Sequence, residues 1–589
     1  MKATTYNFSD FMDNSDTADE AFQRLVAKLA KTAPDTPIYI NFDRRRYDFH
    51  EAKSTSRPCF VSNHEQTGTK HIAMCLENRA NLVLDGNGAE FIFHGTVIPL
   101  ALLNTENCQL KNFSIDYQYP QLHQLVIENV NTKRNEFTVK IDPPEDYFIK
   151  NNNQLFFQHE NNPQHPMRYL MTFNADGRLG WNLPDRCFNP ELITPLPEHR
   201  LKLSNWFHPG QAGDILVLRP NGRPTPGIFL HHCRDTRLEN VTIHYAFGMG
   251  LLAQLCENIH LNQFQVRRSH RTSPRYFTTQ ADATHFSGCK GKIVSENGFY
   301  ESMADDAINV HGTYLQIQRQ IDSHSVVASY MHNESYGFDW GEPGDEVRLI
   351  RAKNMEYLPE ILPISQIFPI DAATGCGAKQ FKILFSTPLP RLPDNEKYGL
   401  ENFTWMPSVE FRCNVIRHNR ARGALFSTVK PIICENNLFD HTHGSAILLC
   451  GDCNGWFESS SCGDVVIRGN HFVNALTANY QFTEGVISIC PAIPDLTTHT
   501  HYFHRNIEIN NNEFDIFDAQ LLYAKSTENL RFANNVIRKN QDFTPFHPNK
   551  FMFKFEHVKN VVISENRFVN IPPEECLTDV ADGVDVCIN

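Results

Sequence analysis

The sequence lacks any long hydrophobic run, although 41% of its 589 residues are hydrophobic. No stretch approaches the ~20 apolar residues that a membrane-spanning helix needs. An excess of basic charge is also missing, because the formal net charge is −13 and Arg267-Arg268 is too short to form a basic patch. We therefore expect no membrane span and no nucleic-acid partner.

Motifs of several enzyme classes are missing as well. The sequence has no Gly-rich phosphate loop, G-x-S-x-G elbow, H-E-x-x-H pair or EF-hand spacing, which disfavours nucleotide-binding proteins, serine hydrolases and metalloproteases. We predict no cofactor and no metal. Residues 1–13 show no basic region followed by an apolar one, so the protein is either cytoplasmic or exported with its leader removed. The oligomeric state is left open.

The cysteines do not suggest a disulfide framework. The chain has 16 of them, but Cys233, Cys256 and Cys289 each precede a strand-like string, and the first two are 256 minus 233, or 23, residues apart. This spacing favours buried, stacked, free thiols over bridges. Cys450 and Cys453 form a lone C-x-x-C pair, which supports a zinc or redox site only weakly.

The chain is longer than the ~250–300 residues at which a single compact core stops growing, so several domains or an elongated repeat are expected. Near its start, Phe22, Leu25, Val26 and Leu29 recur at helical spacing after two acidic residues. We predict an amphipathic helix that covers one end of a sheet, since terminal repeats otherwise expose apolar faces and strand edges.

A recurring unit consists of a short strand of alternating apolar residues, an Asn, one further residue and an aromatic or aliphatic residue. Examples are VVIRGNHF (465–472), IEINNNEF (507–514), LRFANNVI (530–537) and VVISENRF (561–568), and the repeated residues are Asn297, Asn437, Asn470, Asn512, Asn535 and Asn566. Asn tolerates the left-handed backbone of a sharp corner, and stacked Asn side chains can hydrogen-bond from coil to coil. The pattern predicts a right-handed parallel β-helix. An antiparallel sandwich would not place Asn at a fixed offset in each repeat.

Two stretches, 115–225 and 313–408, interrupt the repeat and contain the similar strings AGDILVLR (212–219) and PGDEVRLIR (343–351). Both stretches are rich in strand and turn signals. We therefore predict an all-β chain in five parts. They are a capping helix with the first coils (1–114), an inserted β-barrel (115–225), coils that carry the candidate acids (226–312), a second inserted barrel (313–408) and C-terminal coils (409–589).

Asp282 and Asp306 begin two similar strings, DATHF (282–286) and DAINV (306–310), which are 306 minus 282, or 24, residues apart. This separation is close to the period of the repeat, so the two carboxylates should stack on adjacent coils, ~4.8 Å apart along the sheet. Asp305 adds a third acid. Clustered carboxylates indicate acid–base chemistry, whereas the simpler alternative is that Asp305 or Asp306 only caps a turn.

Further polar residues should lie beside these acids. Asn309 and His311 alternate with apolar residues, so we expect them on the same outer face as the acids, with His285 one coil below Asn309. Such a face is either a sugar-binding groove or a solvated surface. Arg267, with two neighbouring arginines, precedes Asp282 by less than one coil, and we expect at least one of the three to reach the site.

Two other segments combine aromatic and acidic residues. Residues 452–459 (DCNGWFES) place Trp456 near Asp452 and Glu458, and residues 338–342 (FDWGE) place Trp340 near Glu342. A Trp ring beside carboxylates is a common sugar platform. A buried structural Trp fits the first segment equally well, and the core of a barrel fits the second.

At MADDAINVHG (303–312), with ADATHF (281–286) upstream and residues 451–459 downstream, the chain resembles glycoside hydrolase family 110. The similarity runs in order through most of the chain, both insertions included. It implies an exo-acting, inverting α-1,3-galactosidase with Asp282, Asp305 and Asp306 as active-site acids. The implied partner is an oligosaccharide or glycoconjugate with terminal α-galactose, of blood-group-B or linear α-1,3-galactosyl type. Inversion uses an acid and a base ~6.5–9.5 Å apart, so carboxylates on adjacent coils would have to diverge or take another role.

Two other functions remain open. A polysaccharide lyase or polygalacturonase could use the same fold. Lyases that act on uronic acids require a basic site, however. The full polygalacturonase series of N-T-D, D-D, G-H-G and R-I-K is not present in the sequence. A non-catalytic glycan-binding β-helix would need aromatic and amide side chains but would have no use for stacked acids.

Overall fold

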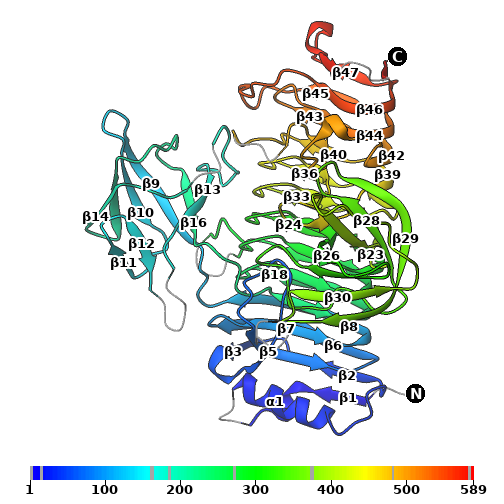
Figure 1. The fold of residues 1–589 in the computed structure, drawn as a ribbon. Helices are drawn as coiled ribbons and strands as arrows, with labels where there is room; N and C mark the ends of the chain where they lie inside the picture. The colour runs from blue at the N-terminus through cyan, green and yellow to red at the C-terminus, as the bar shows by residue number, and fades with distance from the viewer. Residues whose placement is uncertain are drawn as a thin grey trace.

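The chain folds into a long parallel β-helix with two inserted β domains on its sides (Figure 1). The computed structural model describes residues 4–13, 17–158, 165–183, 187–269, 274–371, 377–479, 483–580 and 586–588. Most strands join one sheet of 35 strands, in which each coil pairs in parallel with the coil before it. The predicted fold class is confirmed. Among the described residues, no helix is long and apolar enough to span a membrane.

Three parallel ladders of strands run along the β-helix. The first, which we call the site ladder, contains β5 (Thr69–Glu77), β7 (Ile98–Leu103), β17 (Ile228–His231), β19 (Leu251–Gln254), β22 (Thr284–Ser287), β25 (Ile308–Thr313), β34 (Ala424–Phe426), β37 (Ile447–Leu449), β41 (Ile487–Ile489) and parts of β44 (Leu522–Ala533) and β46 (Phe553–Ser564).

The second and third ladders share the long strands β6 (Leu82–His94), β8 (Glu106–Tyr117) and β18 (Arg234–Ile243). The second continues through β20 (Glu257–Asn262), β23 (Lys290–Glu296), β32 (Pro407–Arg412), β35 (Ile432–Glu435), β39 (Gly463–Arg468) and β42 (His504–Asn510). The third continues through β21 (Gln265–Val266), β24 (Phe299–Glu301), β33 (Val415–Arg417), β36 (Leu438–Asp440), β40 (His471–Val473), β43 (Glu513–Ile516), β45 (Val536–Lys539) and β47 (Arg567–Val569).

A ladder of stacked Asn side chains runs through the C-terminal coils, at the corner between the second and third ladders. The backbone N–H of each Asn donates to Oδ1 of the next at 2.9 Å, in the order Asn414, Asn437, Asn470, Asn512, Asn535 and Asn566. The left-handed conformation belongs to the preceding residue, as in Asn511 with φ 54° and Asn534 with φ 56°. One Asn was predicted to adopt the left-handed backbone at the corner and to hydrogen-bond to the next coil. In the structure, two adjacent residues have these two roles.

The prediction for Asn297 was wrong. Asn297 has φ 56°, and its exposed side chain donates to Oδ1 of Asn262 at 3.0 Å. Gly298 takes the place in the ladder instead, and its N–H donates to Oδ1 of Asn414 at 2.8 Å. The string that contains Asn297 is offset by one residue from the strand register, which the sequence pattern alone did not show.

The predictions of free, buried cysteines and of a capping helix are confirmed. Cys233, Cys256 and Cys289 are buried and free, and the N–H of Cys233 donates to Sγ of Cys256. Helix α1 (Ala18–Leu29) begins with a capping box at Thr17 and buries Phe22 against the first coils. In Figure 1 it lies across the N-terminal end, beside β1 (Thr4–Asn7), β2 (Ile38–Asn41) and β3 (Arg46–His50).

The first insertion projects to the left of the β-helix in Figure 1. It forms an antiparallel sheet of six strands in the order β13 (Tyr169–Phe173), β16 (Ile215–Arg219), β9 (His123–Asn131), β10 (Glu136–Ile141), β15 (Arg200–Ser204) and β14 (Leu192–Leu196), together with a hairpin of β11 (Tyr147–Lys150) and β12 (Gln154–Phe157). The predicted strand at 212–219 is β16, but the described strands of this insertion form an open six-stranded sheet rather than the closed barrel that was predicted.

The second insertion is a closed six-stranded barrel that leaves the site ladder directly after β25. Its strands are β26 (Leu315–Gln320), β27 (Ser325–Ser329), β30 (Gln380–Phe385), β29 (Glu356–Pro369), β28 (Glu346–Arg351) and β31 (Tyr398–Asn402), in barrel order. The first strand of the barrel therefore begins at Leu315, four residues beyond His311 and next to the predicted site.

Candidate active site

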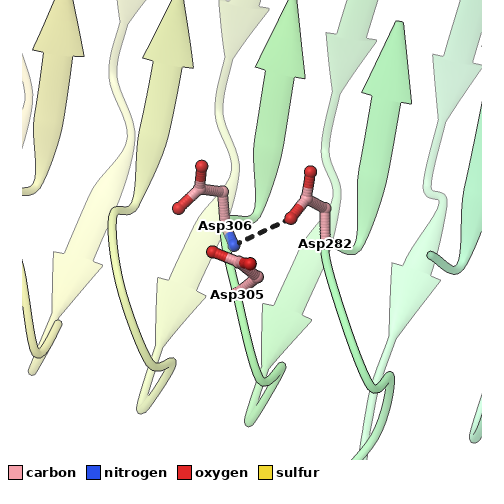
Figure 2. A group of neighbouring side chains, drawn as sticks. All are labelled: Asp282, Asp305 and Asp306. Atoms are coloured by element: carbon pink, nitrogen blue, oxygen red, sulfur yellow. Dashed lines mark hydrogen bonds between the residues drawn. The ribbon is translucent and has the colours of Figure 1, made fainter. Parts of the chain in front are cut away.

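The candidate site lies where loops from the third ladder enter the site ladder. Asp282 and Asp306 each precede a strand of the site ladder by two residues, and the first residues of these strands, Thr284 and Ile308, are register partners. The predicted offset of one coil is therefore confirmed. Figure 2 shows the two side chains next to each other at the entrance to adjacent strands, with Asp305 beside them.

The three carboxylates form a tight cluster. One oxygen of each lies within 4.8 Å of the oxygens of the other two. The side chains of Asp282 and Asp306 are 4% and 1% exposed, whereas that of Asp305 is 13% exposed. The backbone N–H of Asp306 donates to Oδ1 of Asp282 at 3.3 Å (Figure 2). Since an uncompensated buried carboxylate is costly, this cluster needs positive charge or a proton.

Two arginines supply positive charge. Arg422 donates its backbone N–H to Oδ1 of Asp306 at 2.8 Å and Nη2 to Oδ2 at 2.9 Å. Arg223 donates Nη2 to Oδ2 of Asp305 at 2.7 Å. The oxygens are also close enough together to share a cation, but the guanidinium groups already neutralise two of the three charges. The site is thus an acid cluster with paired arginines.

Neither arginine was predicted from the sequence. Arg422 takes the place of Asp306 in the next coil, because Ala424 is the register partner of Ile308. The barrel separates the two positions by 116 residues and hides the repeat. Arg223 follows the first insertion, where no repeat gives its place. The arginine that was predicted instead, Arg267, is exposed, and its side chain contacts Gln265 and the ring of Phe299 rather than the acids.

The environment separates the pKa values of the acids. Burial, together with the charge of Asp305, raises the pKa of Asp282 to about 8. Burial also raises the pKa of Asp306, against the opposing effect of Arg422. Burial alone would raise the pKa of Asp305, but Arg223, Arg422 and Arg420 together bring it below its usual value. At neutral pH the cluster therefore combines an ionised Asp305 with a protonated Asp282.

A chain of buried histidines leads away from Asp282. Nδ1 of His285 lies 2.7 Å from Oδ2 of Asp282, and Nε2 of His285 lies 2.8 Å from Nε2 of His311. Nδ1 of His311 lies 2.6 Å from the carbonyl oxygen of Gly312. Both rings are 1% exposed. Both residues were predicted from the sequence to lie beside the acids, and the structure brings them there.

Glu458 lies on the other side of His311. It belongs to β38 (Glu458–Ser459), which pairs antiparallel with the end of β25, so that Glu458 faces Thr313. Oε1 of Glu458 lies 3.5 Å from Nε2 of His311 and accepts a hydrogen bond from Nδ2 of Asn63 at 3.0 Å. Oγ of Ser335 donates to Oδ1 of Asn63 at 3.1 Å. Residues 62–66, a loop of the barrel and β38 therefore meet beside the acids.

An exposed aromatic pair lies near the same place. The ring of Trp456, a residue that is 43% exposed, stacks on His332 with 4.2 Å between ring centroids. The guanidinium of Arg223 lies 5.8 Å from the Trp456 ring centroid. Asp452 accepts the backbone N–H groups of Asn454, Gly455 and Trp456, so its carboxylate fixes the turn that presents this ring. The sequence had indicated Trp456 and Asp452, but not His332.

The other predicted residues lie in different surroundings. Asn309 is 4% exposed and its Oδ1 has no hydrogen-bond partner among the described residues, so the alternative of a solvated face is wrong. Trp340 belongs to the apolar core of the barrel and donates Nε1 to the carbonyl of Thr313 at 2.8 Å. Glu342 is 62% exposed and lies 3.9 Å from Nζ of Lys290. The structure does not bring Glu342 together with the acids.

Several known proteins are similar to this chain over almost its whole length. The protein named alpha-1,3-galactosidase B of Phocaeicola vulgatus is 47% identical over 561 residues, which cover 94% of this chain and 94% of that protein. Its namesake in Bacteroides fragilis is 46% identical over 574 residues and covers 95% and 96%. That of Akkermansia muciniphila is 37% identical over 579 residues and covers 97% and 70%. No family model matches the chain.

The parallel β-helix, the acid cluster and these relatives together define a glycosidase. The first two relatives are 46–47% identical to this chain over nearly the full length of both proteins, which shows that they belong to one family. The chain belongs to the family of proteins named alpha-1,3-galactosidase B.

Proposed function

We propose that this protein is an exo-acting α-1,3-galactosidase of glycoside hydrolase family 110, which removes terminal α-1,3-linked galactose with inversion. Its substrates are blood-group-B-type or linear α-1,3-galactosyl glycans. The observation that carries the proposal is the cluster of Asp282, Asp305 and Asp306, with oxygens within 4.8 Å of one another and arginines on two of them. The names of the relatives and the resemblance of the motifs support this choice of substrate.

The surroundings of the acids support exo action. Residues from before the first insertion, from the barrel and from β38 are tied together beside the cluster by the contacts of Asn63 with Glu458 and Ser335. Side chains that close one side of a site leave room for the end of a glycan rather than for a chain that passes through. A terminal galactose is the part of the substrate that such a site accepts.

We assign the roles of the acids from their charge states. Asp305, ionised and the most exposed of the three, acts as the general base and takes a proton from water as the water oxygen bonds to the anomeric carbon. Asp282 acts as the general acid and gives its proton to the glycosidic oxygen as the bond from that oxygen to the anomeric carbon breaks. Transfer of a proton from Asp305 back to Asp282 restores the starting state.

Asp306 holds the cluster together in this assignment. Both of its oxygens accept hydrogen bonds from Arg422, and its N–H donates to Asp282. The spacing of the oxygens, within 4.8 Å, is shorter than the ~6.5–9.5 Å of most inverting pairs. The stereochemistry of the product is therefore a sharp test, because a retaining enzyme would have a pair ~5–5.5 Å apart.

The sugar that follows the galactose would pack on Trp456. Trp456 and His332 offer an exposed aromatic face, and Arg223 connects this face to Asp305. Aromatic rings bind the apolar faces of sugars, while nearby carboxylates and guanidinium groups bind hydroxyls. His332 belongs to the barrel, so the second insertion contributes to the choice of substrate.

The decisive experiment is hydrolysis of defined glycans, followed by proton NMR. We expect galactose release from linear and branched α-1,3-galactosides, none from the β-linked isomers, and β-galactose as the first anomer to appear. Release of α-galactose first would show retention and overturn the mechanism. No release from any α-galactoside by the folded protein would overturn the function, and depolymerisation of polygalacturonate in the parallel assay would favour the polygalacturonase alternative.

A further inference from the structure

The hydrogen-bond chain from Asp282 to His311 restricts where its protons can be. A backbone carbonyl only accepts, so Nδ1 of His311 carries a hydrogen toward Gly312. The two Nε2 atoms, 2.8 Å apart, share one hydrogen. One more hydrogen lies between Nδ1 of His285 and Oδ2 of Asp282. A complete chain therefore holds three protons, one more than two neutral imidazoles and a carboxylate hold.

This extra proton has three possible locations. It is on Asp282 when both imidazoles are neutral, on His285 when that ring is the cation, or on His311 when the rings reverse their hydrogen bonds. Burial lowers the pKa of His285 well below its usual value and raises that of Asp282 to about 8. In the resting arrangement Asp282 is therefore the protonated member, and Nε2–H of His285 donates to His311.

We propose that His285 and His311 are positioning residues that keep on Asp282 the proton it delivers to the glycosidic oxygen. His311 accepts from Nε2–H of His285, which leaves Nδ1 of His285 bare toward Asp282. A bare nitrogen accepts a hydrogen bond from a protonated carboxyl group but offers nothing to a carboxylate. The inference rests on the proposed function and extends it to the control of the acid.

Other charged groups face this chain and act on the same proton. Asp305, Arg223, Arg422 and Glu458 act on the charge of Asp282 through space, with Asp306 in direct contact. Glu458 lies 3.5 Å from Nε2 of His311, and the buried His64 lies near enough to His285 for their charges to interact. Arg223 and Arg422 favour the ionised acid, whereas Asp305 and Glu458 favour the protonated one. The histidines add a hydrogen-bond preference to this balance.

The test is the pH dependence of kcat/KM in a His311→Leu variant. Without Nε2 of His311 as an acceptor, His285 can adopt the tautomer with hydrogen on Nδ1. This Nδ1–H then donates to the Asp282 carboxylate and stabilises the ionised acid. Because activity needs the protonated acid, the alkaline limb of the profile should move to lower pH by about one unit on an α-1,3-galactosyl disaccharide. On α-galactosyl fluoride, whose leaving group needs no proton, His311→Leu and the wild type should have the same profile.

A matched control is His504→Leu, since the ring of His504 is equally buried but its Nδ1 accepts a hydrogen bond from the backbone N–H of Cys462 at 3.0 Å instead of contacting an acid. It should keep the wild-type alkaline limb. An alkaline limb that stays in place in His311→Leu would overturn the proposal, as would an equal change in His504→Leu.

Nitrogen-15 NMR of histidine-labelled wild-type protein tests the inference without a variant. We expect His285 as the neutral tautomer with hydrogen on Nε2 at pH 7, and a hydrogen on Nδ1 would overturn it. This result does not depend on activity. If the wild type does not hydrolyse α-galactosides, the proposed function fails, whereas the tautomer still decides whether the histidines hold Asp282 in its protonated form.

Discussion

Two corners of this β-helix stack polar side chains in opposite ways. At the Asn corner each amide both donates and accepts, so Asn512 donates Nδ2 to Oδ1 of Asn535 while its own Oδ1 accepts from Asn470. At the acid corner the stacked groups are carboxyl groups, which repel one another when they are ionised. They are therefore balanced from elsewhere, because Asp306 accepts hydrogen bonds from Arg422, and protonated Asp282 donates to Nδ1 of His285.

The difference shows what a repeat can and cannot supply by itself. A coil gives each side chain an equivalent neighbour on the next coil, and an amide pairs well with a copy of itself. A carboxylate repels its copy. The acid corner thus exists because a later coil provides Arg422 and the segment after the first insertion provides Arg223. Stacking of one residue type stabilises the fold at the first corner and requires compensation at the second.

Replacing the acids should have the largest effect, which is a loss of kcat/KM. We expect Asp305→Asn to lower kcat/KM by about 10³-fold on both an α-1,3-galactoside and α-galactosyl fluoride, because base catalysis is lost in each case. Asp282→Asn should lose a similar factor on the galactoside but retain most activity on the fluoride. Steady-state kinetics on both substrates measure this. Equal losses for Asp282→Asn on the two substrates would remove it as the acid.

A control for these variants is Asp464→Asn. Asp464 lies in an exposed stack on the second ladder, where it accepts from Asn506. The change converts this position into another Asn and should leave kcat/KM as it was.

Removing the compensating positive charge should have the second-largest effect, on the stability of the fold. Arg422→Met leaves Asp306 buried without its partner, which we expect to lower the free energy of unfolding by about 3–5 kcal/mol. Chemical denaturation at neutral pH gives this value. The double variant with Asp306→Asn should recover much of the loss, since the uncompensated acid is gone. A double variant no more stable than Arg422→Met would show that Arg422 acts through packing alone.

Removing a side chain from the Asn corner should lower the free energy of unfolding by a smaller amount and leave catalysis intact. Asn512→Ala removes the side-chain amide that accepts from Asn470 and donates to Asn535, and it leaves these buried partners unsatisfied. We therefore expect a loss of about 1–3 kcal/mol in the free energy of unfolding. The value of kcat/KM should not change. The exposed Asn560 donates to Asn529 at 2.9 Å and has φ 53°, so the comparison there is Asn560→Gly, which keeps this backbone conformation and should cost less because water replaces the contacts of the amide. Equal losses at both positions would contradict the role of burial.

The smallest effect is expected at the aromatic pair. Trp456→Ala should lower kcat/KM on an α-1,3-galactosyl oligosaccharide about tenfold, which corresponds to ~1.4 kcal/mol of lost sugar contact. On α-galactosyl fluoride, which has no second sugar, the kcat/KM of Trp456→Ala should equal that of the wild type. Phe551→Ala, at another exposed aromatic in the C-terminal coils, is the control. A loss of the same size on the fluoride would place Trp456 in contact with the galactose or with the acids instead.

The parts of the site that follow the repeat were predictable from the sequence. Asp282 and Asp306 are one uninterrupted coil apart, so their spacing alone stacks them, and His285 and His311 follow from strand alternation. Arg422 obeys the same register, but 116 residues of inserted barrel and loops separate it from Asp306. Arg223 and Asn63 reach the site from loops, where no period fixes a position. Asn297 shows that even within the repeat a pattern of letters can be offset by one residue from the strand register.

The distance along the chain between Asp306 and Arg422 has a consequence for synthesis. Asp306 leaves the ribosome 116 residues before the arginine that neutralises it, a delay on the order of ten seconds at ~5–20 residues per second. The entire barrel is translated in that interval. Until the barrel is complete, the nascent coil has Arg223 for Asp305 but lacks the partner of Asp306, so the pair between Asp306 and Arg422 forms only after the whole insertion has been translated.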